Sequence, residues 1–406
     1  MTDRRVRRVL QVHTRYRQAG GEDRVVEAEK RLLEAAGIAV HQVLFGNDDL
    51  TEGTSPAGDL RLAASAIWSR AAVRRVRSAI TALRPEVMHV HNTFVAASPS
   101  VYSAGKEVAV VQTLHNYRMV CPVATAFRDG HACTDCVGRF FPWPSVVHAC
   151  LHGSRSQSVV AAAALVAHRA IGTYKHRIDS YIAVTAFQRR LMIAGGLPPE
   201  RIRVIPNFLE PDPGEGTGQR SGLLYVGRLS EEKGIRVLLE AAAALRPGTV
   251  RVIGEGPLQL EVERSAAAGA IAYLGPLEHS AVLDEVRRAI AVVVPSTWFE
   301  GFPLVVLEAF ASGTPVIASD IGSLAEVVEE GLTGMLARPH EADNLEERLR
   351  WAADRPRDMR EMGSKARERY ETRFRGPMHL EALLETYAAV GARTERAGRN
   401  ASRRPA

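Results

Sequence analysis

Short apolar runs alternate with amphipathic stretches along almost the whole chain. Runs rich in Val, Ile and Leu, bounded by polar turn residues, are typical of strands buried on both faces of a parallel sheet. The pattern predicts strands at Val6–Val12, Ala39–Leu44, Val87–His91, Val108–Leu114, Ser180–Val184, Arg203–Ile205, Leu223–Val226, Val250–Ile253, Ile271–Leu274, Ala291–Pro295 and Pro315–Ala318.

Amphipathic stretches with a helical period separate these runs, for example Glu22–Ala36, Ile235–Leu245 and Ala281–Ala289. Strands that alternate with helices indicate parallel sheets covered on both faces. The Pro- and Gly-rich segment Asn207–Gly222 interrupts the series and is typical of an interdomain linker. We therefore predict an α/β fold of two doubly wound, Rossmann-like domains, residues 1–207 and 208–375, facing each other across a cleft.

Composition agrees with a globular protein of this size. The 406 residues are 46% hydrophobic and 24% charged. The apolar run near the N-terminus has no small-residue cleavage site after it, and Val159–Ala167 is too short to cross a bilayer. We expect a cytoplasmic protein.

Arginine dominates the net charge of +6. Part of it lies in residues 392–406, a basic tail that we expect to be disordered because it has no apolar period. Another part lies in the helical pattern Ala66–Pro85. This segment is either a solvated surface helix or a basic patch. Such a patch would contact anionic lipid at the inner face of the membrane or hold a phosphorylated acceptor. No basic–aromatic pattern of a nucleic-acid-binding module is present.

Ligands of doubly wound sheets bind beyond the carboxyl ends of the strands, so the loops there are candidates for chemistry. The strand Leu223–Val226 runs into Gly227 and Arg228, and Lys233 precedes the next helix. Two cations near a helix N-terminus can flank a phosphate, although two surface cations around a turn would look the same.

Two glutamates stand out in the stretch FEGFPLVVLEAFASGTPVIASD, which runs from Phe299 to Asp320. Glu300 precedes a Gly-Phe-Pro sequence that starts a predicted helix, and Glu308 interrupts the apolar run of that helix. Burying a carboxylate without a partner is costly, so each is expected to bind a polar group. A carboxylate accepts hydrogen bonds from vicinal hydroxyls, such as those of a sugar ring or a ribose.

This stretch, with VGRLSEEKG upstream and VIPNF before the linker, resembles glycosyltransferase family 4. The two glutamates match the family's E-x7-E signature, and the resemblance is strongest between Gly222 and Gly334. It implies the GT-B fold, a nucleotide-diphosphate sugar as donor, a retaining hexosyl transfer and a role in cell-envelope or polysaccharide biosynthesis. It also implies a C-terminal helix, residues 376–391, that packs back on the first domain.

The resemblance assigns roles in the second domain. Arg228 and Lys233 would hold the donor diphosphate beside Gly227, and Glu308 would bind the ribose. Glu300 would hold the sugar hydroxyls and act in catalysis. The backbone amides of Gly301, Phe302 and Pro303 would assist Glu300, and those of Leu304 and Val305 would face the phosphate.

In the first domain, the resemblance implies that Gly20 and Gly21 lie near the diphosphate and the acceptor. His115 matches a histidine that lines the cleft near the sugar and is a candidate catalytic residue. His89 and His91 point to one face of a strand, where His91 either lines the cleft or is packed in the core.

No D-x-D motif for a divalent ion is present, and the implied mechanism needs no cofactor: Arg228, Lys233 and a helix N-terminus would offset the charge of the leaving diphosphate. The acceptor would be a glycan, a lipid-linked glycan or a small molecule. The alternatives are a nucleotide-sugar epimerase, which needs additional acid–base carboxylates in the first domain, and a non-catalytic nucleotide-sugar-binding protein.

All four cysteines fall in the segment 116–152, a long insertion with little apolar surface to order it. A C-x2-C pair with one cysteine on each side provides the ligands of a closed tetrahedral zinc site. A redox pair and ordinary packed thiols are the alternatives. The candidate structural zinc ligands are Cys121, Cys133, Cys136 and Cys150.

Overall fold

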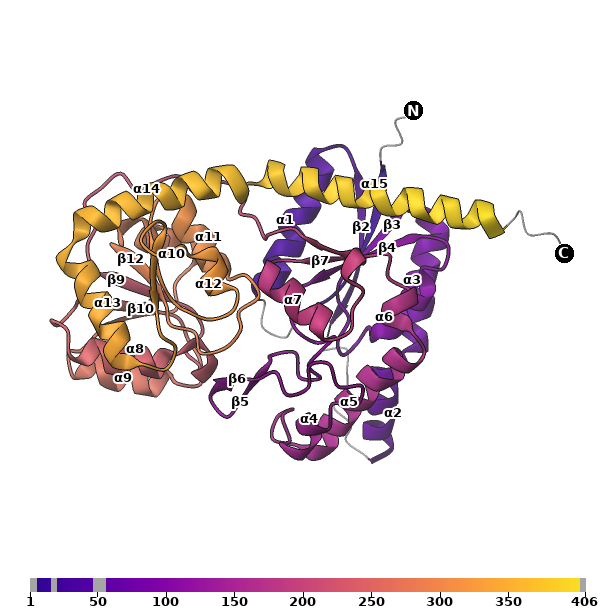
Figure 1. The fold of residues 1–406 in the computed structure, drawn as a ribbon, viewed down its shortest axis with the longest axis horizontal. Coiled ribbons are helices and arrows are strands. Elements are labelled where there is room, and N and C mark those ends of the chain that lie inside the picture. The colour runs from indigo at the N-terminus through magenta and orange to yellow at the C-terminus, as the bar shows by residue number, and fades with distance from the viewer. Residues whose placement is uncertain (1–5, 16–19, 47–55, 402–406) are drawn as a thin grey trace. The chain divides into compact units, whose positions relative to one another are not determined.

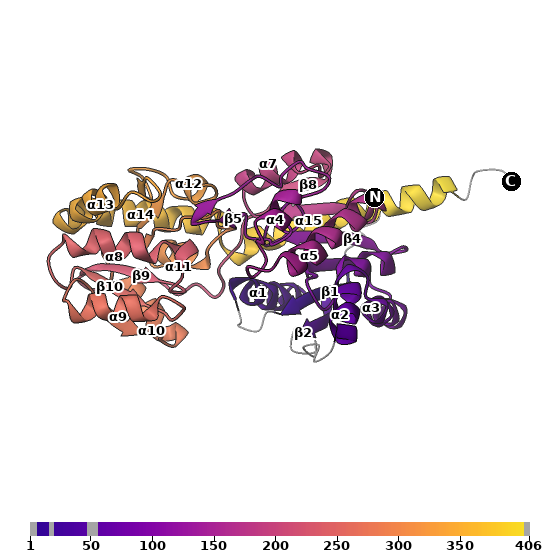
Figure 2. The same cartoon turned by 90° about the horizontal axis from the view of Figure 1, so that it is seen from below.

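The computed structural model describes residues 6–15, 20–46 and 56–401, with the side chains of residues 56–60 and 392–401 outside that description. The chain divides into two compact units, each built around its own sheet (Figures 1 and 2). Unit 1 comprises residues 1–125, 134–205 and 379–406, and unit 2 comprises residues 126–133 and 206–378.

The sheet of unit 1 has six parallel strands in the order β2-β1-β3-β4-β7-β8. The chain order reverses between β1 and β3, and the loops after these two strands meet at this topological switch point. The strands are β1 (Arg8–Arg15), β2 (Ala39–Gly46), β3 (Val87–Asn92), β4 (Ala109–Leu114), β7 (Ser180–Ala183) and β8 (Ile202–Val204).

The sheet of unit 2 also has six parallel strands, in the order β11-β10-β9-β12-β13-β14. Its switch point lies between β9 and β12. The strands are β9 (Leu223–Val226), β10 (Val250–Ile253), β11 (Ala272–Gly275), β12 (Ala291–Val294), β13 (Val316–Ser319) and β14 (Gly334–Ala337).

Helices cover the sheets, and none in the described part of the chain is long and apolar enough to span a membrane. Unit 1 holds α1 (Gly21–Ala35), α2 (Pro56–Ile67), α3 (Arg70–Leu83), α4 (Trp143–Val147), α5 (Arg155–Ala170), α6 (Thr173–His176) and α7 (Ala186–Ala194). Unit 2 holds α8 (Ile235–Ala243), α9 (Gln259–Ala267), α10 (His279–Arg288), α11 (Leu304–Ala311), α12 (Leu324–Val327), α13 (Ala342–Asp354) and α14 (Pro356–Arg373). The last helix is α15 (Gly376–Ala401).

From His379 onward, α15 belongs to unit 1. Leu383, Tyr387 and Val390 are buried in a core cluster with Val9 of β1 and Ile182 of β7. Figure 1 shows α15 beside the elements of unit 1. The C-terminal part of the chain therefore contributes to the core of the unit that the N-terminal residues form.

Three segments differ from the sequence-based expectations. The helix continues to Ala401 through a segment expected to be disordered, because its Ala, Arg and Glu residues are good helix formers. The expected linker Asn207–Gly222 belongs to unit 2, where both terminal guanidinium nitrogens of Arg367 bind the carboxylate of Asp212 at 2.7 and 2.8 Å. The insertion contains a short antiparallel pair, β5 (Phe127–Arg128) and β6 (His131–Ala132).

Candidate active site

At the switch point of unit 2, the loops after β9 and β12 lie against each other. The amide of Thr297 donates to the carbonyl of Glu232 at 3.0 Å. Gly234 has a φ of +69°, and a Cβ atom there would lie 1.8 Å from the carbonyl oxygen of Pro295. Only glycine allows this approach, which brings Lys233 to the loop that carries Glu300.

Lys233 and Glu300 form an ion pair across this switch point. The ammonium of Lys233 is 2.7 and 3.0 Å from the two carboxylate oxygens of Glu300. The hydroxyl of Ser296 donates to Oε1 of the same carboxylate at 2.6 Å, and Lys233 also lies over the ring of Trp298. Burial acts to raise the pKa of Glu300, but the Lys233 ammonium and the hydrogen bonds from Lys233 and Ser296 together outweigh it, so that pKa lies below its usual range. The carboxylate is therefore charged, buried and fixed in orientation.

Helix α11 starts at Leu304, after the Gly301-Phe302-Pro303 segment that follows Glu300. Its first intrahelical bond runs from the amide of Val306 to the carbonyl of Pro303, so the amides of Leu304 and Val305 are N-terminal donors. Asn207 donates to the carbonyl of Phe302 at 3.1 Å and fixes the approach to the helix. The expectation of an amide donor at Pro303 is wrong, because proline has no backbone N–H.

Glu308 lies within α11 and is buried. Nε2 of His279, the first residue of α10, is 3.8 Å from its carboxylate. Arg228 follows β9 and Gly227, and its side chain is exposed. Unit 2 thus places a paired carboxylate, a second carboxylate, helix amides and an exposed guanidinium at the carboxyl ends of its central strands.

The switch point of unit 1 carries polar groups that the sequence did not single out. Glu22, in the first turn of α1, accepts from the amide nitrogen of Asn92 at the end of β3, at 3.0 Å. Burial and the neighbouring Asp23 raise the pKa of Glu22 to about 8, against the opposing influence of Arg118 and Asn92. The carboxyl group is therefore protonated near neutral pH and can donate a hydrogen bond. Gly20 and Gly21 directly precede it, and residues 16–19 before them lie outside the described residues.

His115 and His91 are neighbours at the carboxyl end of the same sheet. Nε2 of His115, just after β4, is 3.0 Å from Nδ1 of His91 on β3. His91 is buried and His115 is partly exposed. The sequence left open whether His91 lines the cleft or is packed in the core. In the structure, His91 is buried and contacts His115, the candidate catalytic histidine.

In the part of the chain that the structure describes, no group of three candidate metal-ligand atoms within 4.8 Å of one another contains a cysteine. Cys121, Cys136 and Cys150 belong to unit 1, whereas Cys133 belongs to unit 2. Among the described residues, Glu29, His89 and His91 form the one group of three that places candidate metal-ligand atoms within 4.8 Å of one another. A zinc site on the cysteines would require segment 116–152 to close around the ion, and zinc there stays a prediction.

Sequence patterns could have revealed part of what was missed. Glu22 directly follows the glycine pair at a helix N-terminus, and Asn92 directly ends a strand, so the switch-point rule alone pointed to both. The pairing of Lys233 with Glu300 has no local signal, because sixty-seven positions separate the two residues.

Family models match nearly the whole chain. The model described as Glycosyltransferase Family 4 matches residues 19–213, and the model described as Glycosyl transferases group 1 matches residues 215–369. A glycogen synthase of Mycobacterium tuberculosis (strain H37Rv) is 29% identical over 372 residues, covering 88% of this chain and 80% of the relative. A D-inositol 3-phosphate glycosyltransferase of Nocardia farcinica is 34% identical over 242 residues, 52% of this chain and 53% of that protein.

Solved structures share the fold. A glycosyltransferase from Rickettsia africae superposes with a TM-score of 0.67 at 15% identity, covering 95% of this chain and 98% of that one. The Anabaena protein HepE in complex with UDP-glucose gives a TM-score of 0.63 at 18% identity, with 94% and 99% covered. The predicted GT-B fold class is confirmed. The two family models follow one another along the sequence in the same order as the two sheets, and the chain belongs to glycosyltransferase family 4.

Proposed function

We propose that unit 2 binds a nucleotide-diphosphate sugar and that the protein transfers the sugar with retention of anomeric configuration to a glycan, a lipid-linked glycan or a small molecule. The observation that carries the proposal is the Lys233–Glu300 pair at the switch point of unit 2, where a sheet of this topology binds its ligand. Family membership supports a transferase that uses nucleotide sugars.

Each donor group has a partner of suitable chemistry in unit 2. The diphosphate would contact the side chain of Arg228 and the backbone amides of Leu304 and Val305. It would also contact the ammonium of Lys233, which is bound to Glu300 on its other side. Glu308 would accept the ribose hydroxyls, and Glu300 would accept those of the sugar. Because Lys233 already holds Glu300 in one orientation, the carboxylate would need little reorganisation as charge develops on the sugar.

The mechanism would be a front-face substitution in which the leaving phosphate takes the acceptor's proton. No divalent ion would be required, because Arg228, Lys233 and the start of α11 supply positive charge where the phosphate leaves. Activity should persist in EDTA. Loss of activity in EDTA that magnesium or manganese restores would overturn this part of the proposal.

The setting would be the cytoplasmic side of the membrane, in envelope or polysaccharide biosynthesis. The surface of α3 supports this: Arg70, Arg74, Arg75 and Arg77 are exposed, while Val73 and Val76 are buried beneath them. With its apolar face packed inward, α3 would contact anionic headgroups through charge and would not insert.

The decisive experiment is a donor screen followed by an acceptor assay. Bound donor stabilises the fold by mass action, so a thermal-shift screen of nucleotide sugars should identify it, starting with UDP-sugars because HepE was solved with UDP-glucose. Release of nucleoside diphosphate should then require an acceptor. An epimerase would interconvert donors without net transfer, and a non-catalytic binding protein would give a shift without turnover. An NMR spectrum of the product with the inverted anomeric configuration would refute retention.

A further inference from the structure

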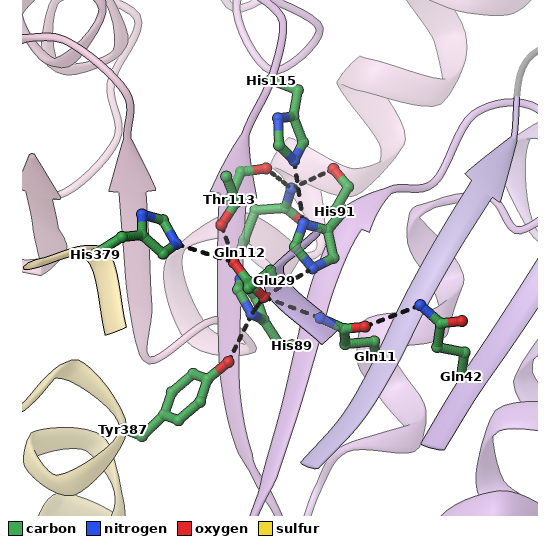
Figure 3. Close-up of polar contacts among 10 residues, drawn as sticks. All are labelled: Gln11, Glu29, Gln42, His89, His91, Gln112, Thr113, His115, His379 and Tyr387. Atoms are coloured by element: carbon green, nitrogen blue, oxygen red, sulfur yellow. Dashed lines mark hydrogen bonds and ion pairs between the residues drawn. The ribbon is translucent and has the colours of Figure 1, made fainter. Parts of the chain in front are cut away.

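A carboxylate at the centre of unit 1 connects three histidines from two elements, a strand and the C-terminal helix. Glu29 of α1 lies between His89 and His91 of β3 and His379 of α15 (Figure 3). All four side chains are buried. Burying a carboxylate costs several kcal/mol unless hydrogen-bond donors surround it. The positions of the protons on the surrounding histidine rings therefore matter.

Glu29 is an anion that several donors hold in place. Oε1 accepts from Nε2 of Gln11 at 2.9 Å and lies 3.0 Å from Nδ1 of His89, and Oε2 lies 3.4 Å from Nε2 of His379. Burial acts to raise the pKa of Glu29, but the neighbouring His89 and the hydrogen bonds from His379 and His89 oppose it, and that pKa lies well below its usual range. A fixed negative charge therefore faces His91.

That charge selects one tautomer of His91. Nε2 of His91 is 3.5 Å from Oε1 of Glu29, and burial together with His89 lowers the pKa of His91 to about 4, so the ring is neutral. A lone pair on Nε2 would be repelled by the carboxylate, whereas an N–H there is attracted. The single proton therefore belongs on Nε2, and Nδ1 carries the lone pair.

The tautomer of His91 determines the tautomer of His115. Nδ1 of His91 is 3.0 Å from Nε2 of His115 (Figure 3), and because Nδ1 is an acceptor, His115 must donate its Nε2–H. Burial and the neighbouring His91 lower the pKa of His115 well below its usual range, so this ring is neutral as well. Its Nδ1 is then left with a lone pair on a residue that is partly exposed at the carboxyl end of the sheet.

We propose that Glu29 is a positioning residue that acts through His91 to fix His115 in the Nε2–H tautomer, so that Nδ1 of His115 accepts a hydrogen bond from a hydroxyl of the sugar or acceptor. The role at the hydroxyl rests on the proposed function; the tautomer does not. Without the carboxylate, both tautomers of His91 become accessible, and with them both tautomers of His115.

The direct test is ¹⁵N NMR of protein labelled at histidine, which distinguishes protonated from unprotonated ring nitrogens. In the wild type, His115 should show a protonated Nε2 and an unprotonated Nδ1, with its signals assigned by their loss in His115→Phe. Glu29→Gln should produce a mixture or the opposite tautomer. His91→Asn, whose side-chain oxygen can replace Nδ1 as the acceptor, should retain the wild-type tautomer, whereas His91→Leu should lose it.

Tyr387→Phe is the matched control. It removes the hydroxyl that lies 2.8 Å from Nδ1 of His89, in the same buried cluster but outside the path from Glu29 to His115. It should leave the His115 tautomer unchanged, and its thermal midpoint gauges the stability cost of disturbing this core.

Activity provides the second readout. Glu29→Gln should lower kcat/KM at least about tenfold, since removing the orienting carboxylate of a histidine costs far more in a hydrolase triad. His91→Asn, which keeps an acceptor for the Nε2–H of His115, should lose much less of kcat/KM than Glu29→Gln does. A wild-type His115 with the proton on Nδ1, or an unchanged tautomer in folded Glu29→Gln, would overturn the assignment.

A metal ion on Glu29, His89 and His91 would also overturn it, because it would take the Nε2 lone pair of His91 and reverse both tautomers. If the predicted tautomers were observed in a protein without transferase activity, the proposed function would fail and the positioning role of Glu29 would stand.

Discussion

The Lys233 ammonium is already bound to Glu300 before any donor enters. An ammonium held by a buried carboxylate has part of its charge neutralised, so it offers less to an incoming diphosphate than its position suggests. Arg228 is exposed, and its guanidinium can bind two phosphate oxygens at once. We therefore expect Arg228 to contribute most of the side-chain charge that the leaving group meets.

Replacing Arg228 tests this expectation. Arg228→Ala should lose about 2 kcal/mol of transition-state stabilisation, about 30-fold in kcat/KM, with an unchanged thermal midpoint because the side chain is exposed. Arg236→Ala is the control, since Arg236 is an exposed arginine of the same unit bound to Glu261. Equal turnover in the two variants would remove Arg228 from the diphosphate site.

The two glutamates near the start of α11 should separate binding from transfer. Glu308→Gln should mainly weaken binding of the free nucleoside diphosphate, whereas Glu300→Gln should mainly lower kcat, because only Glu300 is assigned to the sugar where charge develops. Isothermal titration and steady-state kinetics on both variants provide the measurement. Identical effects on affinity and on kcat would show that this division of roles is wrong.

Glu22 predicts a pH dependence of stability. With a pKa raised to about 8, the folded chain keeps a proton that the unfolded chain releases above its ordinary carboxyl pKa, so this contribution to stability falls as pH rises toward 8. Glu22→Gln cannot ionise. Its thermal midpoint relative to wild type should therefore increase between about pH 5 and about pH 9.

The control for Glu22 is Glu27→Gln, which removes another carboxylate from the same helix. The signal is the difference between the two variants across the pH range. A Glu22→Gln midpoint that runs parallel to wild type at every pH would show that Glu22 ionises normally in the folded chain.

At the scale of elements, apolar patterning predicted the sheets well and the short pieces poorly. All strands of both six-stranded sheets except β14 have ends within about three residues of the predicted runs, because strands buried on both faces leave a continuous apolar signal. The run GMLA of β14 is short and starts with glycine, and β5 and β6 have two residues each. Such pieces form because neighbouring strands or turns hold them, which a local pattern does not record.

The candidate site was predictable only where one segment carries it. Glu300 and Glu308 lie in one continuous segment, the loop before α11 and α11 itself, so the sequence shows their spacing directly. The Lys233–Glu300 pair and the cluster around Glu29 each join elements far apart in sequence, and only the strand order brings them together. The C-terminal helix contributes His379 and Tyr387 to a cluster that starts at Gln11.

The cysteine segment, residues 116–152, leads to a prediction about the metal content of the protein. If a structural zinc orders residues 116–152, purified protein should contain about one zinc ion per chain, and Cys133→Ser should lose it while donor binding persists in unit 2. Glu29→Gln is the control that keeps all four thiols and changes the other candidate ligand group. A metal-free preparation with full activity and four titratable thiols would exclude the zinc site.

Over the whole molecule, the two units repeat one plan with different strand orders. Each sheet places a carboxylate at its switch point: Glu22 beside Asn92 in unit 1, and Glu300 beside Lys233 in unit 2. The partners differ in charge, and so do the carboxyl groups. Glu22 is protonated near neutral pH, whereas Glu300 is ionised. The same position in the fold thus provides a hydrogen-bond donor in one unit and an acceptor in the other.

The net charge of +6 and the exposed arginines of α3 predict binding to anionic membranes. Each arginine near a negatively charged bilayer contributes about 1 kcal/mol, an attraction that salt screens within about 10 Å. The double variant Arg74→Glu, Arg77→Glu should therefore bind vesicles containing phosphatidylserine at least about tenfold more weakly than wild type, and neutral vesicles should bind neither protein. Cosedimentation at low and physiological salt measures this. The control, Arg246→Glu with Arg357→Glu, makes the same change of net charge at exposed positions of unit 2. Equal losses in the two double variants would mean that overall charge, and not the surface of α3, attracts the protein to the membrane.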